Sequence, residues 1–153
     1  MRRFIVIIVS TFFYLGYLPL IPGTFGSLAG IFLFYCIKGN ILAYAVLILI
    51  LMVLGLLLSA EAEKIFNQKD SRYIVIDEVV GMLLSLLFIP YSIKLVILAF
   101  FIFRLLDTLK PYPAGISQRL NAGLGVMGDD IVAGIYTNLV LQLILRLASF
   151  KIA

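Results

Sequence analysis

Long runs of apolar residues alternate with short polar segments along this chain. The apolar runs cover about 4–20, 27–37, 41–59, 79–90, 92–106 and 131–149. A helix that crosses the hydrocarbon core of a bilayer needs about 20 residues. Run 41–59 meets this length, and run 131–149 does so with its ends counted. Run 27–37 is long enough only if its helix tilts or begins at Pro22. The pattern predicts an all-α, polytopic membrane helix bundle with four to six membrane helices and a short or re-entrant N-terminal segment.

Three polar segments separate these runs, at residues 18–27, 60–78 and 109–130. If successive apolar runs cross the membrane in alternating directions, all three segments fall on one face. Lys38, Lys94 and both termini then fall on the other face. The first face also receives every acid of the chain: Glu61, Glu63, Asp70, Asp77, Glu78, Asp107, Asp129 and Asp130. We therefore expect the active site at one membrane face.

The composition supports a membrane protein. Of the 153 residues, 63% are hydrophobic and 13% are charged, whereas about a quarter of the residues of an ordinary soluble domain are charged. The length predicts one domain over 1–153. The net charge of +4 suits anionic lipid headgroups, but basic residues are scattered and form no nucleic-acid-binding patch. They divide equally between the two predicted faces, so they do not indicate which face is cytoplasmic.

Five carboxylates lie beside apolar sequence. Asp77 and Glu78 are at the mouth of a predicted membrane helix, Asp129 and Asp130 open the last predicted helix, and Asp107 lies in a third segment. Unpaired acids that converge repel one another. A set of oxygen ligands with no histidine points to Mg²⁺, with Mn²⁺ as the other choice. The sequence therefore predicts metal ligation by all five acids. The alternative is that helix capping and ion pairs with Arg104, Lys110 and Arg119 account for them.

The stretch FRLLDTLKPYP, at 103–113, places three charged residues at intervals of three. Residues three apart share one face of a helix, so Arg104, Asp107 and Lys110 would form one charged row. Pro111 ends the helix soon after Lys110. Arginine suits bidentate phosphate contacts and lysine supplies a point charge. We expect Asp107 to hold the metal and the two basic residues to hold the phosphate.

A second candidate phosphate-binding element is PGTFGS, at 22–27, just before an apolar helix. Proline suits a first helical turn, and glycines leave backbone N–H groups accessible to an anion. Gly23, Thr24 and Ser27 are the predicted phosphate-binding residues of this segment. The same pattern is common in ordinary turns, so it gains weight only from the nearby basic residues.

A phosphate site in a membrane protein suggests a lipid phosphate as substrate. The chain has no histidine, which excludes a phosphohistidine intermediate, and Cys36 lacks the arginine six positions later that a cysteine phosphatase needs. Two routes remain. A carboxylate could act as general base toward metal-activated water, which we favour, or Asp107, Asp129 or Asp130 could form an aspartyl-phosphate intermediate.

The motifs PGTFGS, IVIDEVVG, FRLLDTLKPYP and GLGVMGDDIVAG, in this order, resemble those of the phosphatidylglycerophosphatase A family. The resemblance extends from Gly16 to Asn138. It implies a Mg²⁺-dependent, multi-pass enzyme of the bacterial inner membrane that converts phosphatidylglycerophosphate to phosphatidylglycerol, with its site on the cytoplasmic face. The family's charged motif positions correspond here to Asp77, Glu78, Arg104, Asp107, Lys110, Asp129 and Asp130. Asp107, Asp129, Asp130, Arg104 and Lys110 are the expected catalytic residues.

Two other function classes compete with a phosphatase. Intramembrane carboxylates often line cation channels or transporters, although these acids gather at one face. A CDP-alcohol phosphotransferase also uses carboxylates and Mg²⁺, but its motif of spaced aspartates does not match DDIVAG at 129–134. The sequence gives no indication of the oligomeric state.

Overall fold

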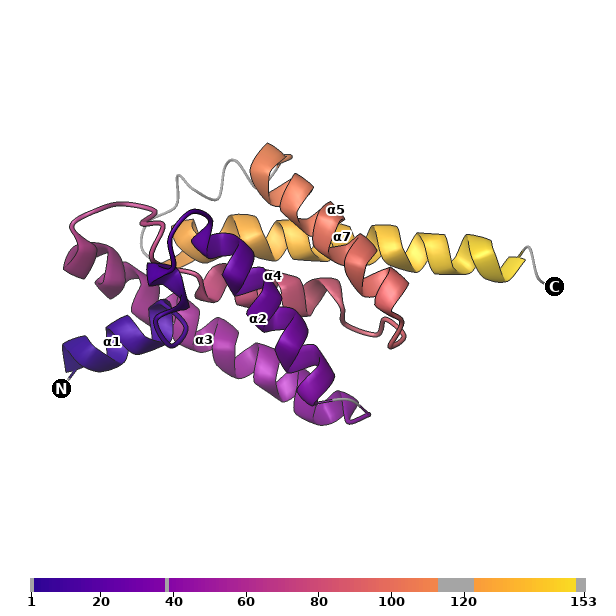
Figure 1. The fold of residues 1–153 in the computed structure, drawn as a ribbon, viewed down its shortest axis with the longest axis horizontal. Coiled ribbons are helices and arrows are strands. Elements are labelled where there is room, and N and C mark those ends of the chain that lie inside the picture. The colour runs from indigo at the N-terminus through magenta and orange to yellow at the C-terminus, as the bar shows by residue number, and fades with distance from the viewer. Residues whose placement is uncertain (1, 38, 113–122, 151–153) are drawn as a thin grey trace.

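A computed structural model describes residues 2–37, 39–112 and 123–150, and the described part is all-α. The helices are α1 (Arg2–Ser10), the short 3-10 helix η1 (Leu15–Tyr17), α2 (Pro22–Cys36), α3 (Ile41–Phe66), α4 (Ile76–Ser85), α5 (Ile93–Leu109) and α7 (Gly123–Phe150). Run 4–20 contributes to α1 and η1, and each of the other predicted apolar runs contributes to one helix. Figure 1 shows the two ends of the chain at opposite ends of the long axis.

The short helix α4 is the centre of the bundle. Eight of its ten residues are buried, and it packs between α2 and α7, with α3 and α5 completing its surroundings. Its apolar side chains Val79, Met82 and Leu83 are fully buried. A helix that is buried all round needs apolar residues on every face. The acids of α4 are accordingly confined to its first turn.

The C-terminal end of α4 is stabilised by side chains of neighbouring helices. The Tyr44 hydroxyl of α3 donates to the Leu83 carbonyl at 2.7 Å. The Asn138 amide of α7 donates to the carbonyls of Ser85 and Leu87 at 3.1 and 2.7 Å. The last carbonyls of a helix have no partner inside the helix, and an apolar environment makes an unpaired carbonyl costly. These three bonds therefore allow α4 to end inside the bundle.

Two of the described helices are long and apolar enough to cross a membrane: Ile41–Phe66 and Gly123–Leu147. Both expose large apolar side chains, among them Leu42 and Leu57 on α3 and Leu143 on α7. Helix α2 begins at Pro22, one of the two alternatives for run 27–37, and with 15 residues it is shorter than the two candidate spans. Helix α5 ends at Leu109, followed by Lys110 with φ 47° just before Pro111, so the predicted stop is confirmed. The larger number of four to six membrane helices stays a prediction.

The predicted position of the N-terminus is wrong. Arg2 forms an ion pair with Glu61 near the end of α3, at 3.1 Å, so the N-terminus lies with an acid and not on the opposite side. Helix α1 has only nine residues, and three consecutive residues with positive φ (Phe12, Phe13 and Tyr14) follow it in a tight turn. Nine residues span about 14 Å, too little to cross a bilayer.

The last helix begins earlier than predicted. It starts at Gly123, so Asp129 and Asp130 lie in its second turn and do not cap its N-terminus. Gly123, in the polar segment 109–130, packs closely against α3: a Cβ there would collide with the backbone carbonyl of Leu56. Tertiary contact with α3 thus offsets the weak helix propensity of glycine.

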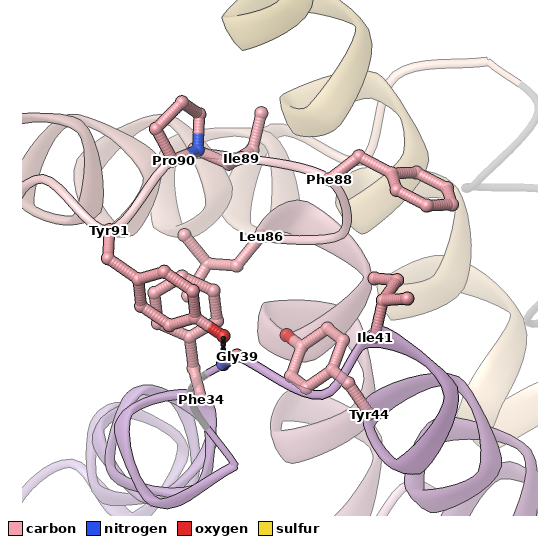
Figure 2. Close-up of a pocket in the computed structure, with 9 residues that line it drawn as sticks. All are labelled: Phe34, Gly39, Ile41, Tyr44, Leu86, Phe88, Ile89, Pro90 and Tyr91. Carbon is pink, nitrogen blue, oxygen red and sulfur yellow. Dashed lines mark hydrogen bonds between the residues drawn. The ribbon is translucent and has the colours of Figure 1, made fainter.

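An apolar cavity of about 470 Å³ lies at the C-terminal end of α2. Figure 2 shows Phe34 and Tyr91 stacked at its wall, with ring centroids 4.5 Å apart, and Tyr44 on the other side. The backbone N–H of Gly39 donates to the Tyr91 hydroxyl. None of its described lining residues is charged. Phe34 lies 11 residues beyond Gly23 in the same helix, or about 16 Å along the axis, so the cavity is separate from the candidate phosphate-binding segment.

Candidate active site

Three carboxylates from two helices converge beside the start of α4. Asp77 and Glu78 belong to its first turn, and Asp130 comes from α7. One carboxylate oxygen of each residue lies within 4.8 Å of the other two. Asp77 and Asp130 are 6% and 3% exposed, so water screens their charges poorly. We call these three residues the acidic triad.

The donor atoms of the triad fit a hard divalent cation. Within the described part of the chain, Glu78 Oε2 and Asp130 Oδ1 are buried and have no hydrogen-bond partner. A buried carboxylate oxygen without a partner is costly. The three clustered carboxylates also repel one another, and Asp107 and Asp129 add negative charge around Asp130. Mg²⁺ and Mn²⁺ favour such oxygen ligands, so the triad has the chemistry to hold either ion.

The other two predicted metal ligands are engaged in ion pairs. Arg104 Nη1 lies 2.7 Å from Asp107 Oδ2, and Lys110 Nζ lies 2.6 Å from Asp129 Oδ2. The first pair is within α5, and the second joins α5 to α7. Both pairs lie next to the triad. The predicted charged row of Arg104, Asp107 and Lys110 therefore does lie beside the triad carboxylates. The five predicted ligands thus divide into a triad and two paired acids, whose ligation of metal stays a prediction.

Opposing influences act on the Lys110 ammonium. Burial disfavours its charged form and lowers its pKa, but the hydrogen bond to Asp129 and the charges of Asp129, Asp70 and Asp107 outweigh this, so the pKa of Lys110 is raised above its ordinary value. A lysine with a raised pKa keeps its charge throughout the physiological range. Lys110 is therefore available as a fixed positive charge at the site.

The PGTFGS segment forms the first turns of α2 and packs against the same site. A Cβ on Gly23 would collide with Glu78 Oε1 and would lie 3.3 Å from Arg104 Nη1. Thr24 is half-buried beside it. The Ser27 hydroxyl is fully buried and donates to the Gly23 carbonyl at 3.0 Å, so it has a structural partner. Phosphate binding by Gly23, Thr24 and Ser27 stays a prediction, and Gly23 lies against Glu78 and Arg104 of the site.

One acid that sequence reasoning placed on this face, but did not choose as a site residue, acts on the charges of the site. Asp70 follows α3, and its backbone N–H donates to Glu63 at 2.6 Å. Although it keeps exposed surface, partial burial and the charges of Asp129, Glu63 and Asp107 raise its pKa, and Lys110 opposes them. In the sequence it is one of the acids assigned to the face with the site, and it lies seven residues before Asp77. Arg119, the third basic residue considered for ion pairing, lies outside the described residues.

The chain is similar throughout most of its length to known phosphatases. The profile of the family described as phosphatidylglycerophosphatase A matches residues 8–145. Two relatives with this name, from Escherichia coli and Haemophilus influenzae, are 35% and 34% identical over 123 residues, which cover 78% of this chain and 72% and 76% of theirs. A Bacteroides thetaiotaomicron relative named "Putative phosphatidylinositol-3-phosphatase" is 32% identical over 143 residues, or 88% of this chain and 89% of its own. No solved structure matches the chain.

Proposed function

The chain belongs to the phosphatidylglycerophosphatase A family, and from this premise we propose that it is a Mg²⁺-dependent lipid phosphatase that hydrolyses the terminal phosphomonoester of phosphatidylglycerophosphate. The membership makes it a phosphatase. The observation that carries the finer proposal is the buried acidic triad, which has two unpartnered oxygens and lies beside two paired basic side chains.

Asp77, Glu78 and Asp130 would hold the metal ion. A bound divalent cation neutralises phosphoryl charge and lowers the pKa of a coordinated water. Two features of this chain favour binding. The negative charge of the triad is concentrated in a buried space, and the two unpartnered oxygens would gain a partner. Asp107 and Asp129 lie close enough to Asp130 for their charges to act on it and strengthen the attraction.

Arg104 and Lys110 would bind the phosphate of the substrate. Each is already oriented by an acid, Asp107 in one case and Asp129 in the other, so little side-chain freedom is lost on binding. Arginine can contact two phosphoryl oxygens at once. The first turn of α2, with Gly23 against Glu78 and Arg104, would bring backbone N–H groups to the same phosphate. The lipid tail would remain among the apolar helices.

Hydrolysis requires a proton acceptor for the attacking water. We assign this role to the Asp107 carboxylate, which Arg104 holds at the edge of the triad. The water oxygen bonds to phosphorus, its proton passes to Asp107, and the bond from phosphorus to the glycerol oxygen breaks. That oxygen takes up the proton from Asp107, and the products are phosphatidylglycerol and inorganic phosphate. Attack by an aspartate of the site is the competing route.

The proposal includes a location and a second substrate class. The location is the one that the motif resemblance implies: a multi-pass protein of the bacterial inner membrane with its site on the cytoplasmic face. The Bacteroides relative bears the name of a phosphatase that acts on a different headgroup, and it is matched over nearly all of its length. A phosphoinositide is therefore the second candidate substrate for the same reaction.

The test is phosphate release by the purified protein in detergent. Phosphatidylglycerophosphate, phosphatidylinositol 3-phosphate and phosphatidic acid are compared, each with Mg²⁺ and with EDTA. We expect Mg²⁺-dependent release with preference for the first lipid. Preference for the phosphoinositide would establish the second candidate. Activity that persists in EDTA would remove the metal role. No release from any lipid would refute the proposal and direct attention to cation flux and to CDP-alcohol phosphotransfer.

A further inference from the structure

In both helices that form the acidic triad, a glycine follows the acids by one helical turn. Gly81 lies four residues after Asp77 and three after Glu78, and Gly134 lies four residues after Asp130. Residues three or four apart share a helix face. The glycines therefore lie on the faces that carry the acids, where α4 and α7 meet.

At these glycines the two backbones touch without a side chain between them. A Cβ on Gly134 would lie 2.5 Å from the Gly81 carbonyl oxygen and 3.1 Å from two further Gly81 backbone atoms. A Cβ on Gly81 would lie 2.7 Å from the Asp130 carbonyl oxygen and 2.6 Å from the Phe103 ring. Backbone atoms cannot rotate away as a flexible side chain can. Any larger residue at either position must therefore move one helix relative to the other.

We propose that Gly81 and Gly134 are positioning residues of the metal site, which set the distance between α4 and α7 and hence bring Asp130 to Asp77 and Glu78. The inference rests on the proposed metal binding by the triad. It assigns these glycines a role in metal geometry in addition to the packing that any close helix contact provides.

The size of the effect follows from the contact distances. Ordinary Cβ contacts begin at 3.4 Å, but an alanine methyl at position 134 would lie 2.5 Å from the Gly81 carbonyl oxygen. The two helices must therefore separate here by about 0.9 Å, the difference of the two distances. Mg²⁺ and Mn²⁺ need oxygen ligands close to ideal positions, and Mg²⁺ tolerates little deviation from about 2.1 Å. Displacing one of three protein ligands by this amount should weaken metal binding roughly tenfold to a hundredfold, the range seen when the support of a metal ligand is removed.

Gly55 offers a matched control. It lies on α3 and also packs against α7, and a Cβ there would lie 2.5 Å from the sulfur of Met127. The nominal overlap equals that at Gly134, but the obstacle is the end of a flexible side chain that can rotate aside. A general effect of glycine replacement on stability would occur at both positions, whereas an effect on the triad should occur only at Gly134.

The experiment titrates Mn²⁺ into the purified full-length protein and measures free Mn²⁺ by electron paramagnetic resonance, with thermal unfolding in EDTA alongside. We expect Gly134→Ala to bind Mn²⁺ roughly tenfold more weakly or worse, and Gly55→Ala to stay within about threefold of wild type. Should Gly134→Ala fail to fold, Gly81→Ala takes its place, because its overlap with the backbone is smaller. A folded Gly134→Ala or Gly81→Ala variant with wild-type Mn²⁺ affinity would overturn the inference. A wild-type protein that binds no Mn²⁺ would overturn the proposed metal site itself.

Discussion

Replacing Asp130 with asparagine tests the triad directly, because it removes one charge and keeps the shape of the side chain. The carboxylate oxygens of the triad lie within 4.8 Å of one another, and Asp130 is 3% exposed. At an effective dielectric constant of 20, two unit charges at this distance repel by about 3.5 kcal/mol. Proton uptake by the metal-free cluster relieves part of this repulsion. We therefore expect Asp130→Asn to stabilise the metal-free protein by about 1–2 kcal/mol.

Mg²⁺ should reverse the order of stability. A ligand at a hundred times its dissociation constant stabilises the folded state by about 2.7 kcal/mol, and wild type should gain this amount. The variant lacks one ligand and should gain little. Thermal unfolding in detergent, in EDTA and in saturating Mg²⁺, measures both effects, since 1 kcal/mol corresponds to about 2–4 °C for a chain of this size. The variant should unfold later than wild type in EDTA and earlier in Mg²⁺, and it should release no phosphate.

Glu61→Gln is the control for the loss of an acidic charge. Glu61 pairs with the exposed Arg2, far from the triad in the chain, and such surface pairs contribute at most about 1 kcal/mol. Its effect should be small and equal in both conditions. The reasoning is refuted if Asp130→Asn destabilises the metal-free protein, or if Mg²⁺ stabilises that variant as much as wild type.

Three further substitutions test other parts of the site and its support. Arg104→Lys keeps the charge but loses the planar guanidinium group, so kcat/KM should fall roughly 10- to 100-fold. A fall of less than about threefold would show that Arg104 does not bind phosphate in a bidentate manner. Lys110→Met leaves the buried Asp129 carboxylate without its ion-pair partner, so phosphate release and the unfolding temperature should both fall, and wild-type turnover would exclude a role for Lys110. Asn138→Leu removes the donor to the Ser85 and Leu87 carbonyls. It should lower the free energy of unfolding by about 1–3 kcal/mol and leave the Mn²⁺ affinity unchanged. A shift in affinity would show that this end of α4 also supports the site.

The sequence predicted helices well where local chemistry decides their ends. Pro22 begins α2, and Pro111 follows the end of α5, because proline suits a first helical turn and cannot continue a helix. It predicted the start of α7 poorly, since the residues before Asp129 were assigned to the polar segment between helices. Contact with α3 stabilises these residues as helix, and such contact is not visible in a local pattern.

The sequence by itself determined the class of the protein and the chemistry at its disposal. Apolar runs, carboxylates confined to three segments and the absence of histidine led to the prediction of a membrane enzyme with oxygen ligands for a metal ion. Only the tertiary structure decided which acids form the triad and which pair with Arg104 and Lys110. The type of ligand follows from side-chain chemistry, but the ligand set depends on how closely helices approach. That approach is decided where backbones touch, at Gly81 and Gly134, 53 residues apart in the chain.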